Sequence, residues 1–486
     1  MVFSNPWYFV FLAVVLVALA PPLSIPAKKK ILAVASCFFY ACWDYRYLGL
    51  LLFISVVDYV CAAKMDAAAP TARRRWLTAS LVSNLGLLGY FKYTNFFLDN
   101  LNGVGASFGF HLPHQDILLP AGISFFTFKT MSYVIDVYRR ELAPVRSLWD
   151  YVTFVTFFPE LIAGPIVRAS VLLPQMDRSI GPRRERLGLG ASIFLLGFTK
   201  KMIADRIGTM VTPVFERPTT FSTATLWAVA LGYALQIYCD FSGYSDMAIG
   251  SAKMIGYDLP ENFAMPYLSA DITEFWRRWH MTLSQWLRDY LYIPLGGNRL
   301  GTGRTYVNLM LTMLLGGLWH GASWNFVVWG GLHGVALALH RLGRDRARPR
   351  LPRALGIATT FVFVTLCWIP FRASTFAETR AFFAGLFSAQ AGLSWIAPEF
   401  WWLVALVAIG HVVGALAREP EGSGASLRLQ SLLSRLDAKL VSNPISGPYF
   451  RLGTGSILGA YVVLAWVLFA FLFAVTDSNP FIYFQF

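Results

Sequence analysis

Apolar stretches close to the length of a membrane-spanning helix recur along the whole chain, and only short polar segments separate them. A helix needs about 20 apolar residues to cross the hydrocarbon core of a bilayer. The stretches that meet or approach this length are residues 7–25, 31–43, 47–64, 76–98, 117–137, 187–204, 222–242, 305–318, 323–340, 354–371, 399–417 and 454–475. Several are too short to cross unaided, which predicts tilted, broken or re-entrant helices among the spans.

The composition supports a membrane protein and excludes two other classes. Hydrophobic residues make up 56% and charged residues 14% of the 486 positions, whereas a soluble domain carries roughly 25% charged residues. A chain with so few charges cannot cover a soluble surface. Its apolar runs also lack the alternation with polar residues that the strands of a porin-type barrel require. The predicted fold class is an all-α polytopic membrane protein.

The basic residues, which give the chain a formal net charge of +14, stand in short clusters between the apolar stretches. The clusters are Lys28–Lys30, Arg73–Arg75, Arg139 with Arg140, Arg183–Arg186 and Arg341–Arg353. This pattern is typical of loops retained on the cytoplasmic side, and it also suits contact with anionic lipid headgroups. No nucleic acid partner is expected. The first apolar run is predicted to be a retained span, which places the N-terminus outside a multiply crossed inner (cytoplasmic) membrane.

One polytopic domain is predicted for residues 1–486, with the chemistry-bearing motifs gathered in residues 233–334. Residues 418–451 are a polar insert whose middle, LRLQSLLSRLDAKL, has the spacing of an amphipathic helix on the cytoplasmic leaflet. Residues 149–167 carry two prolines, Gly164 and Glu160 inside an apolar frame, so a straight span is not expected there. The absence of an internal sequence repeat leaves a transporter built from inverted repeats without support.

Ionisable side chains are frequent in residues 233–334, where an apolar setting makes them costly unless they pair, line a cavity or take part in chemistry. Residues 272–292 space their apolar side chains at three- and four-residue steps, which predicts one helix with an apolar stripe. His280 lies at the edge of that stripe, close to Arg277 and Arg278. Two interpretations are open: a functional histidine, or an interfacial helix with Trp and Arg anchors and an incidental histidine.

His320 ends a fully apolar run from Leu309, in the sequence GGLWHG, between Trp319 and Gly321. A helix that ends among glycines leaves backbone groups without helical partners and gives room for a ligand. Histidine transfers protons near neutral pH, so we predict a catalytic role for His320. The alternative is a core histidine bonded to a backbone carbonyl. Asn325, five residues on, is a candidate to orient the ring or an acyl carbonyl.

Two acids, Asp240 and Asp246, occur close together in the segment CDFSGYSD. They could coordinate a cation, or they could pair with Arg277, Arg278 or Arg288 and hold a cavity together. Structural pairing is the favoured interpretation.

His333 and His340 lie seven residues apart on one predicted helix. Packing roles are expected for both, because the i, i+4 spacing of a helical metal pair and its nearby acid are missing. The five cysteines form no CxxC pair. The sequence therefore predicts neither a metal site nor a bound cofactor.

Three long segments resemble the membrane-bound O-acyltransferase (MBOAT) family: DFSGYSDMAIG, PENFAMPYLSADITEFWRRWHMTLSQWLRDYLYIPLGGNR and GGLWHGASWNFVVWGGLHG. The similarity is closest to the bacterial alginate O-acetyltransferase branch. It extends to residues 120–140, 157–168 and 368–387 and to the terminal NPFIYFQF, so it covers most of the chain. The resemblance implies a ring of transmembrane helices around a thinned centre with a catalytic tunnel. It also implies that His320, in the WHG motif, is the essential catalytic residue and that His280, in WRRWH, is a second catalytic histidine, which would stabilise the oxyanion or position the donor. Many relatives carry Gln or His where this chain has Glu160, so no catalytic role is assigned to that position.

The resemblance implies transfer of an acetyl or similar short acyl group across the membrane. The donor would be a cytoplasmic thioester such as acetyl-CoA or an acyl carrier. The acceptor would be an extracytoplasmic polysaccharide such as alginate, cellulose or peptidoglycan, modified together with an SGNH/serine-hydrolase-like acetyltransferase partner. Acyl transfer to a hydroxyl needs a base and donors for the oxyanion. His320 is the expected base, and the substrate-binding candidates are Asn325, Trp319, Arg277 and Asp246.

Two other functions stay open. One is transfer of D-alanyl or another acyl group to a cell-wall polymer, as in the teichoic-acid branch of the family. The other is a non-catalytic role, as a transporter or as a scaffold of an export complex.

Overall fold

The computed structural model of the protein describes residues 3–178, 180–346, 351–416, 418 and 466. These residues form helices and connecting segments, and an isolated bridge between Phe221 and Leu393 is the only β-type pairing within this part of the chain. The all-α prediction is confirmed. The insert predicted for residues 418–451 and the span predicted for residues 454–475 lie, apart from Arg418 and Trp466, outside the described residues.

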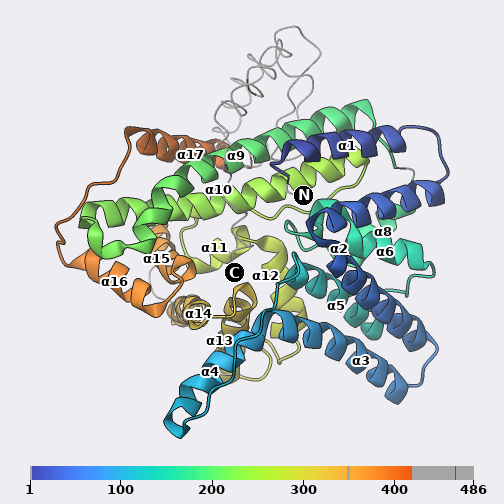
Figure 1. Ribbon diagram of the computed structural model, residues 1–486, viewed down its shortest axis with the longest axis horizontal. Helices are drawn as coiled ribbons and strands as arrows, with labels where there is room; N and C mark the ends of the chain where they lie inside the picture. Colours follow the sequence, from blue (N-terminus) through green and yellow to red (C-terminus); the bar gives the residue numbers. More distant parts are fainter. Residues whose placement is uncertain (1–2, 179, 347–350, 417, 419–465, 467–486) are drawn as a thin grey trace. The chain divides into compact units, whose positions relative to one another are not determined.

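The chain divides into two compact units, which are described separately. Unit 1 comprises Met1–Leu187, Ser251–Pro260 and Gly321–Ser323, and unit 2 comprises Gly188–Gly250, Glu261–His320 and Trp324–Phe486. The helices that begin in unit 1 (Figure 1) are α1 (Pro6–Leu19), α2 (Ile25–Asp66), α3 (Pro70–Leu88), η1 (Gly89–Tyr93), α4 (Thr94–Gly105), η2 (Ala106–Phe108), α5 (Ile123–Arg139), α6 (Leu148–Thr156), α7 (Phe158–Leu161), α8 (Ala169–Met176) and α9 (Arg184–Glu216).

Most of α9 belongs to unit 2, which also contains the segments that carry the predicted site. Its further helices are η3 (Pro218–Thr220), α10 (Thr223–Ile255), η4 (Pro266–Leu268), α11 (Ile272–Arg278), α12 (Met281–Leu287), η5 (Arg288–Tyr292), α13 (Thr302–His320), α14 (Trp324–Asp345), α15 (Arg353–Arg372), α16 (Phe376–Phe387) and α17 (Pro398–Leu416).

Helix starts in unit 2 follow local capping rules. At the start of α11, the Asp271 carboxylate accepts the backbone N–H of Glu274 at 2.8 Å, and the Glu274 carboxylate reaches back to the N–H of Ala270 at 2.7 Å. Thr375 and Glu378 repeat the arrangement at the start of α16. Each pair satisfies two of the N–H groups that a helix leaves without partners, so these short sequences define where the helices begin.

Several predicted spans differ from the helices in length. Residues 31–43 and 47–64 belong to one 42-residue helix, α2, which is kinked at Asp44 where the backbone leaves helical geometry. The break expected within residues 149–167 is confirmed, because Phe157 (φ −47°, ψ 103°) separates α6 from α7. Both α9 and α10 are 33 residues long and exceed the predicted stretches.

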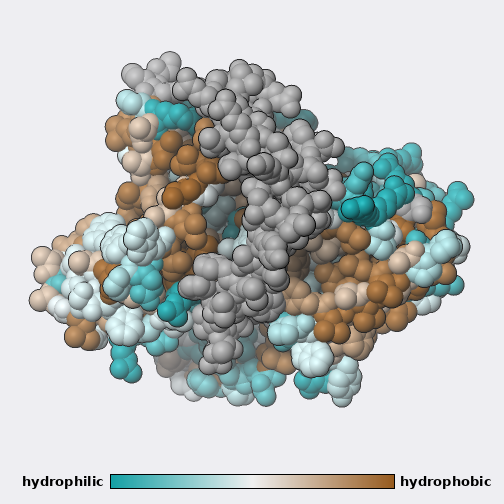
Figure 2. Space-filling model, turned by 90° about the horizontal axis from the view of Figure 1, so that it is seen from above, coloured by the Kyte–Doolittle hydropathy of each residue, from teal (hydrophilic) through white to brown (hydrophobic). Residues whose placement is uncertain are grey.

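Four helices of the described part are long and apolar enough to cross a membrane by length and composition: α2, α9, α15 and α17. Figure 2 shows broad apolar areas, in brown, on the surface of the protein. Large apolar side chains such as Val17 on α1 (73% exposed) and Trp402 on α17 (78% exposed) contribute to this surface. Exposed apolar area of this kind needs a lipid environment. The protein is therefore a multi-pass membrane protein.

Glycines allow α9 and α10 to run directly alongside each other in unit 2 (Figure 1). Gly190 and Gly197 on α9 face Gly250 and Gly243 on α10, and a Cβ at Gly197, Gly243 or Gly250 would collide with backbone of the facing helix. Small residues at a helix contact bring the backbones close together, a common feature of membrane helix pairs. The close approach places the polar side chains of α9 next to those of α10.

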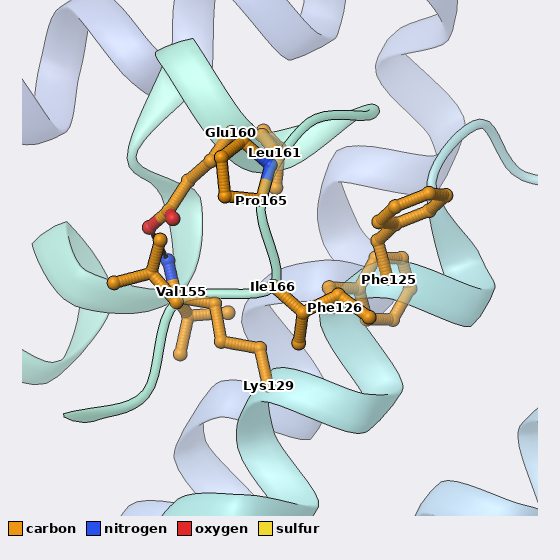
Figure 3. Close-up of a pocket in the computed structure, with 9 residues that line it drawn as sticks. Phe125, Phe126, Lys129, Val155, Glu160, Leu161, Pro165 and Ile166 are labelled. Carbon is orange, nitrogen blue, oxygen red and sulfur yellow. Dashed lines mark hydrogen bonds and ion pairs between the residues drawn. The ribbon is translucent and has the colours of Figure 1, made fainter. Parts of the chain in front are cut away.

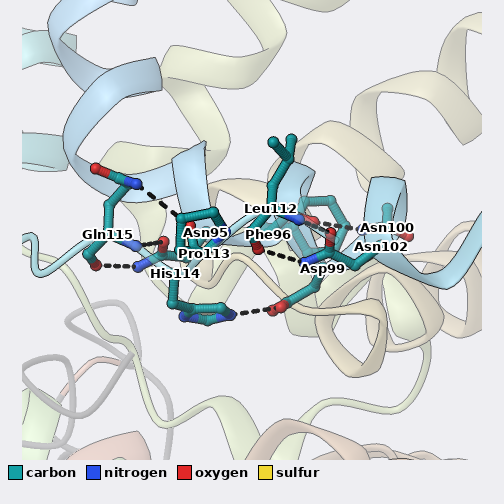
Figure 4. A network of polar contacts seen from close by, with 9 residues as sticks. All are labelled: Asn95, Phe96, Asp99, Asn100, Asn102, Leu112, Pro113, His114 and Gln115. Carbon is teal, nitrogen blue, oxygen red and sulfur yellow. Dashed lines mark hydrogen bonds and ion pairs between the residues drawn. The ribbon is translucent and has the colours of Figure 1, made fainter. Parts of the chain in front are cut away.

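A polar clamp fixes the segment that follows α4 in unit 1 (Figure 4). Three polar side chains on one face of α4 bond the extended return segment: Asn95 with Gln115, Asp99 with His114 and Asn102 with Leu112. The Asn102 side chain both accepts from the Leu112 N–H at 2.7 Å and donates to its carbonyl at 2.9 Å. The Asn102 side chain thus forms the two hydrogen bonds that a neighbouring strand would otherwise form with the backbone N–H and C=O of Leu112.

Candidate active site

His320 is the last residue of α13 and is 3% exposed. Gly317 allows α13 to pack closely against α14, because a Cβ at this position would lie 2.2 Å from the carbonyl oxygen of Phe326 on α14. Three aromatic rings surround the imidazole, with centroids at 5.0 Å (Trp319), 5.1 Å (Trp329) and 5.3 Å (Phe371). The predicted position of His320 at the end of a helix is confirmed, and its side chain is buried among these rings.

His280 interrupts the predicted helix over residues 272–292. The continuous-helix prediction is wrong: α11 ends at Arg278, α12 begins at Met281, and residues Arg288–Tyr292 form a π-helical turn. His280 itself has φ 41° and ψ 56°, in the left-handed region, and is fully buried. This conformation costs a residue with a side chain roughly 1–2 kcal/mol, although histidine tolerates it better than most residues. Strain of this kind is concentrated at functional sites.

Asn262 holds His280 and was not predicted as a site residue. Its Oδ1 accepts from the His280 Nδ1 at 3.0 Å, from the Thr282 hydroxyl at 2.9 Å and from the Thr282 backbone N–H at 3.3 Å. Its Nδ2 donates to the Ser245 hydroxyl on α10 at 3.2 Å. The available signal in the sequence was a polar residue inside the motif PENFAMPYL.

Trp319 links the two histidines that the sequence singled out. Its ring centroid lies 5.0 Å from that of His320 and 6.3 Å from that of His280. Phe241 of α10 packs edge-on to the His280 ring, with the centroids 4.6 Å apart. The structure therefore brings His280, Trp319 and His320 together inside unit 2, from the α11–α12 break and the end of α13.

The other predicted substrate-binding residues have the following surroundings. The Asn325 amide donates to the carbonyl of Ala373 at 2.8 Å, which ties the start of α14 to the end of α15. Arg277 is exposed on α11. Asp246 bonds Lys200 at 2.6 Å.

The predicted pairing of Asp240 and Asp246 is confirmed, but its partners were predicted wrongly. Lysines of α9 take the place of the three arginines: Lys200 pairs with Asp246, and Lys201 bridges Asp205 at 2.6 Å and Asp240 at 2.9 Å. The close α9–α10 packing brings the lysines within reach. The arginines have nearer acids, since Arg278 pairs with Glu274 and Arg288 with Asp289.

His333 is fully buried on α14 among aromatic rings, including Trp276 at 5.2 Å, Trp329 at 4.8 Å and Phe363 at 5.7 Å. Neither of its ring nitrogens has a hydrogen-bond partner among the described residues. His340, two turns further on, bonds the Thr273 hydroxyl at 2.9 Å. Within the same part of the chain, no group of three or more His, Cys, Asp or Glu side chains is placed to hold a metal ion.

A second buried polar feature lies in unit 1, where Lys129 of α5 and Glu160 of α7 form an ion pair (Figure 3). Their side chains are 5% and 1% exposed, and the Lys129 ammonium also lies 4.4 Å from the centroid of the Phe154 ring. The pair borders a small cavity with room for about one water molecule. The second carboxylate oxygen of Glu160 has no hydrogen-bond partner within the described chain.

The sequence profile of the membrane-bound O-acyltransferase family matches residues 122–374. The chain belongs to the MBOAT family. It is therefore an acyltransferase of the membrane, and the matched range contains His280, Trp319 and His320 as well as the Lys129–Glu160 pair.

Relatives of known name lie in several branches of this family. A probable alginate O-acetylase AlgI of Azotobacter vinelandii is 46% identical over 373 residues, which are 75% of this chain and 74% of that protein. The peptidoglycan O-acetyltransferase of Helicobacter pylori is 42% identical over 71% of each chain. The teichoic acid D-alanyltransferase of Streptococcus thermophilus is 30% identical over 53% of this chain and 69% of that protein.

Proposed function

We propose that the protein transfers an acetyl or similar short acyl group to a polysaccharide outside the cell, with His320 as the general base. The observation that carries this proposal is that two buried histidines, His320 and His280, both contact the ring of Trp319. The names of the relatives, alginate and peptidoglycan O-acetyltransferases, support O-acetylation of a polymer as the activity.

The reaction moves an acyl group from sulfur to oxygen. His320 removes the proton from the attacking hydroxyl as the new C–O bond forms at the thioester carbonyl, and the C–S bond breaks as the tetrahedral intermediate collapses. The imidazolium then returns the proton to the departing thiolate, so the thiol and the ester are the products and no proton is left over. The burial of His320 strengthens such interactions, because little water competes for them.

In this proposal the two substrates approach from opposite sides of an inner membrane. The thioester, acetyl-CoA or an acyl carrier, arrives from the cytoplasm, where the basic loops also contact lipid headgroups. The acceptor lies outside, on the side that the sequence predicts for the N-terminus, and an SGNH/serine-hydrolase-like acetyltransferase works there as the partner. The substrate is alginate, cellulose or peptidoglycan. The D-alanyltransferase relative makes D-alanyl transfer to a cell-wall polymer the second candidate.

Acetyl transfer by the purified, detergent-solubilised protein from radiolabelled acetyl-CoA tests the proposal. Turnover that disappears in His320→Ala and persists in His333→Phe, a matched change of a second buried histidine in the same unit, is the expected result. Equal turnover by the wild type and His320→Ala would move the chemistry away from His320. Label transfer from a D-alanyl thioester but not from acetyl-CoA would select the second candidate.

A further inference from the structure

Three hydrogen-bond donors converge on one oxygen beside His280. Asn262 Oδ1 faces the His280 Nδ1, the Thr282 hydroxyl and the Thr282 backbone N–H, while Asn262 Nδ2 faces the Ser245 hydroxyl. All four residues belong to unit 2, and all four are buried. Both the oxygen and the nitrogen of the Asn262 side-chain amide therefore have hydrogen-bond partners.

This arrangement fixes which ring nitrogen of His280 carries the proton. The Thr282 backbone N–H can only donate, so the Asn262 atom that faces it must be the carbonyl oxygen rather than the amide nitrogen. A carbonyl oxygen can only accept, so the His280 Nδ1 that faces the same oxygen must carry a hydrogen. In the neutral imidazole the lone pair then lies on Nε2.

We propose that Asn262 is a positioning residue that keeps His280 as a hydrogen-bond acceptor at Nε2. His280 then receives a hydrogen bond from an O–H or N–H group of a bound substrate, and in its neutral form it does not donate one to the oxyanion. The left-handed backbone at His280 and the bond from Asn262 to Ser245 hold the ring in this orientation. The proposal rests on the proposed function and divides the work between the two histidines: His320 moves the proton, and His280 orients a substrate group.

A spectroscopic measurement tests the tautomer directly. The full-length protein is labelled with ¹⁵N-histidine in detergent or lipid, and the His280 signals are assigned by their absence in His280→Asn. At a pH where the ring is neutral, the shifts are expected to show a protonated Nδ1 and an unprotonated Nε2. A protonated Nε2 in the wild type would overturn the proposal whether or not the protein transfers acyl groups in the assay.

Variants of Asn262 test the consequence for turnover. Asn262→Leu keeps the approximate shape but removes the acceptor, and about 10- to 100-fold lower turnover is expected, the range found when residues that orient metal-binding histidines are replaced. Asn262→Asp keeps an acceptor facing Nδ1 and should recover most of that loss. Asn308→Leu is the matched control, since Asn308 is another fully buried asparagine of unit 2 that donates to a backbone carbonyl, that of Gly297 at 3.0 Å.

The outcomes separate this inference from the proposed function. Equal losses in Asn262→Leu, Asn262→Asp and Asn308→Leu, with His280 shifts unchanged in all three, would mean that Asn262 is only structural. If His320→Ala keeps full turnover, the proposed base is wrong, while the tautomer of His280 is still decided by its ¹⁵N shifts.

Discussion

A Cβ added to Gly197 would lie 2.4 Å from the carbonyl oxygen of Gly243, so the backbones of α9 and α10 touch where these two glycines face each other. This contact also brings charged side chains of the two helices within reach of each other. One turn further along, Lys200 and Lys201 reach Asp246 and Asp240 across the same helix pair. Buried charges without partners are costly, so the glycine contact is a condition for the ion pairs.

A bulky residue at this contact should therefore destabilise unit 2. In Gly243→Leu the new Cβ would start 2.7 Å from the carbonyl oxygen of Gly197, and a loss of about 1–3 kcal/mol is expected from overpacking alone. Thermal unfolding in detergent measures it. Gly410→Leu on α17 is the control, because a Cβ there meets nothing within 4 Å. Equal melting temperatures for the two variants would contradict the role given to the contact.

In a double-mutant cycle of the Lys129–Glu160 pair, the losses of stability in the two single variants should not be additive. Removing one partner, in Lys129→Met or Glu160→Gln, leaves a buried group without its counterpart and should cost about 3–5 kcal/mol. The double variant should recover most of that loss, because no buried charge is left. The exposed pair Arg206–Glu399 serves as the control, with a coupling of about 0–1 kcal/mol. Additive losses at positions 129 and 160 would mean that the two side chains do not interact.

Because the backbone of His280 is left-handed, a glycine variant at this position should be more stable than an alanine variant, which is the reverse of the order inside a helix. Both His280→Ala and His280→Gly lose the ring, but only glycine relieves the backbone, so the glycine variant should be the more stable by roughly 1 kcal/mol. At Gln285, inside α12, the order should be reversed, since glycine in a helix costs about 1 kcal/mol relative to alanine. Melting temperatures of the four variants decide this. An alanine variant that is more stable than the glycine variant at position 280 as well as at position 285 would exclude strain at His280.

His333 is expected to be replaceable by a ring without nitrogens. Its two ring nitrogens are buried without hydrogen-bond partners among the described residues, and an unsatisfied buried polar group costs about 1–3 kcal/mol. His333→Phe should keep the aromatic packing and leave the melting temperature unchanged or raise it. His333→Ala is the comparison, with a loss of roughly 2–5 kcal/mol from the cavity. Loss of acyl transfer in folded His333→Phe would show a role beyond packing.

Asp258, in the loop after α10, should make the stability of unit 1 dependent on acid pH. Burial raises the pKa of its carboxyl, but hydrogen bonds and charges from Lys253 and Arg186 outweigh burial and bring the pKa below its ordinary value. Such a group stabilises the fold above its unfolded pKa of about 3.9, and this contribution is lost as the pH falls through the lower folded value. The difference in melting temperature between wild type and Asp258→Asn should therefore shrink between pH 7 and pH 3. A difference that stays constant over that range would rule out the linkage.

The features that the sequence predicted correctly are local ones. Hydropathy identified the helical membrane class, and Pro159 with Gly164 indicated the break after α6. The placement of His320 at a helix end followed from the glycines and the apolar run around it. Each of these properties depends on residues that are neighbours in the chain, so a short window of sequence contains the information.

The features that were missed depend on tertiary contacts. The apolar spacing of residues 272–292 continues across His280, because apolar side chains are buried on both sides of the break, among them Phe275 on α11 and Leu283 and Trp286 on α12. The periodicity therefore hid the left-handed residue. Asn262 and the lysines of α9 were missed for a related reason, since their partners lie many residues away. A signal did exist for the lysines, as two adjacent charges in the otherwise apolar residues 187–204.

The Lys129–Glu160 pair also limits how this protein can diverge. A lineage that loses either charge first passes through a protein with an uncompensated charge in its interior, and selection for folded protein acts against that intermediate. The two positions should therefore be inherited as a linked pair. Descendants that carry a neutral residue at position 160 are expected to have discarded the lysine at position 129 as well, or to have acquired a new anion beside it.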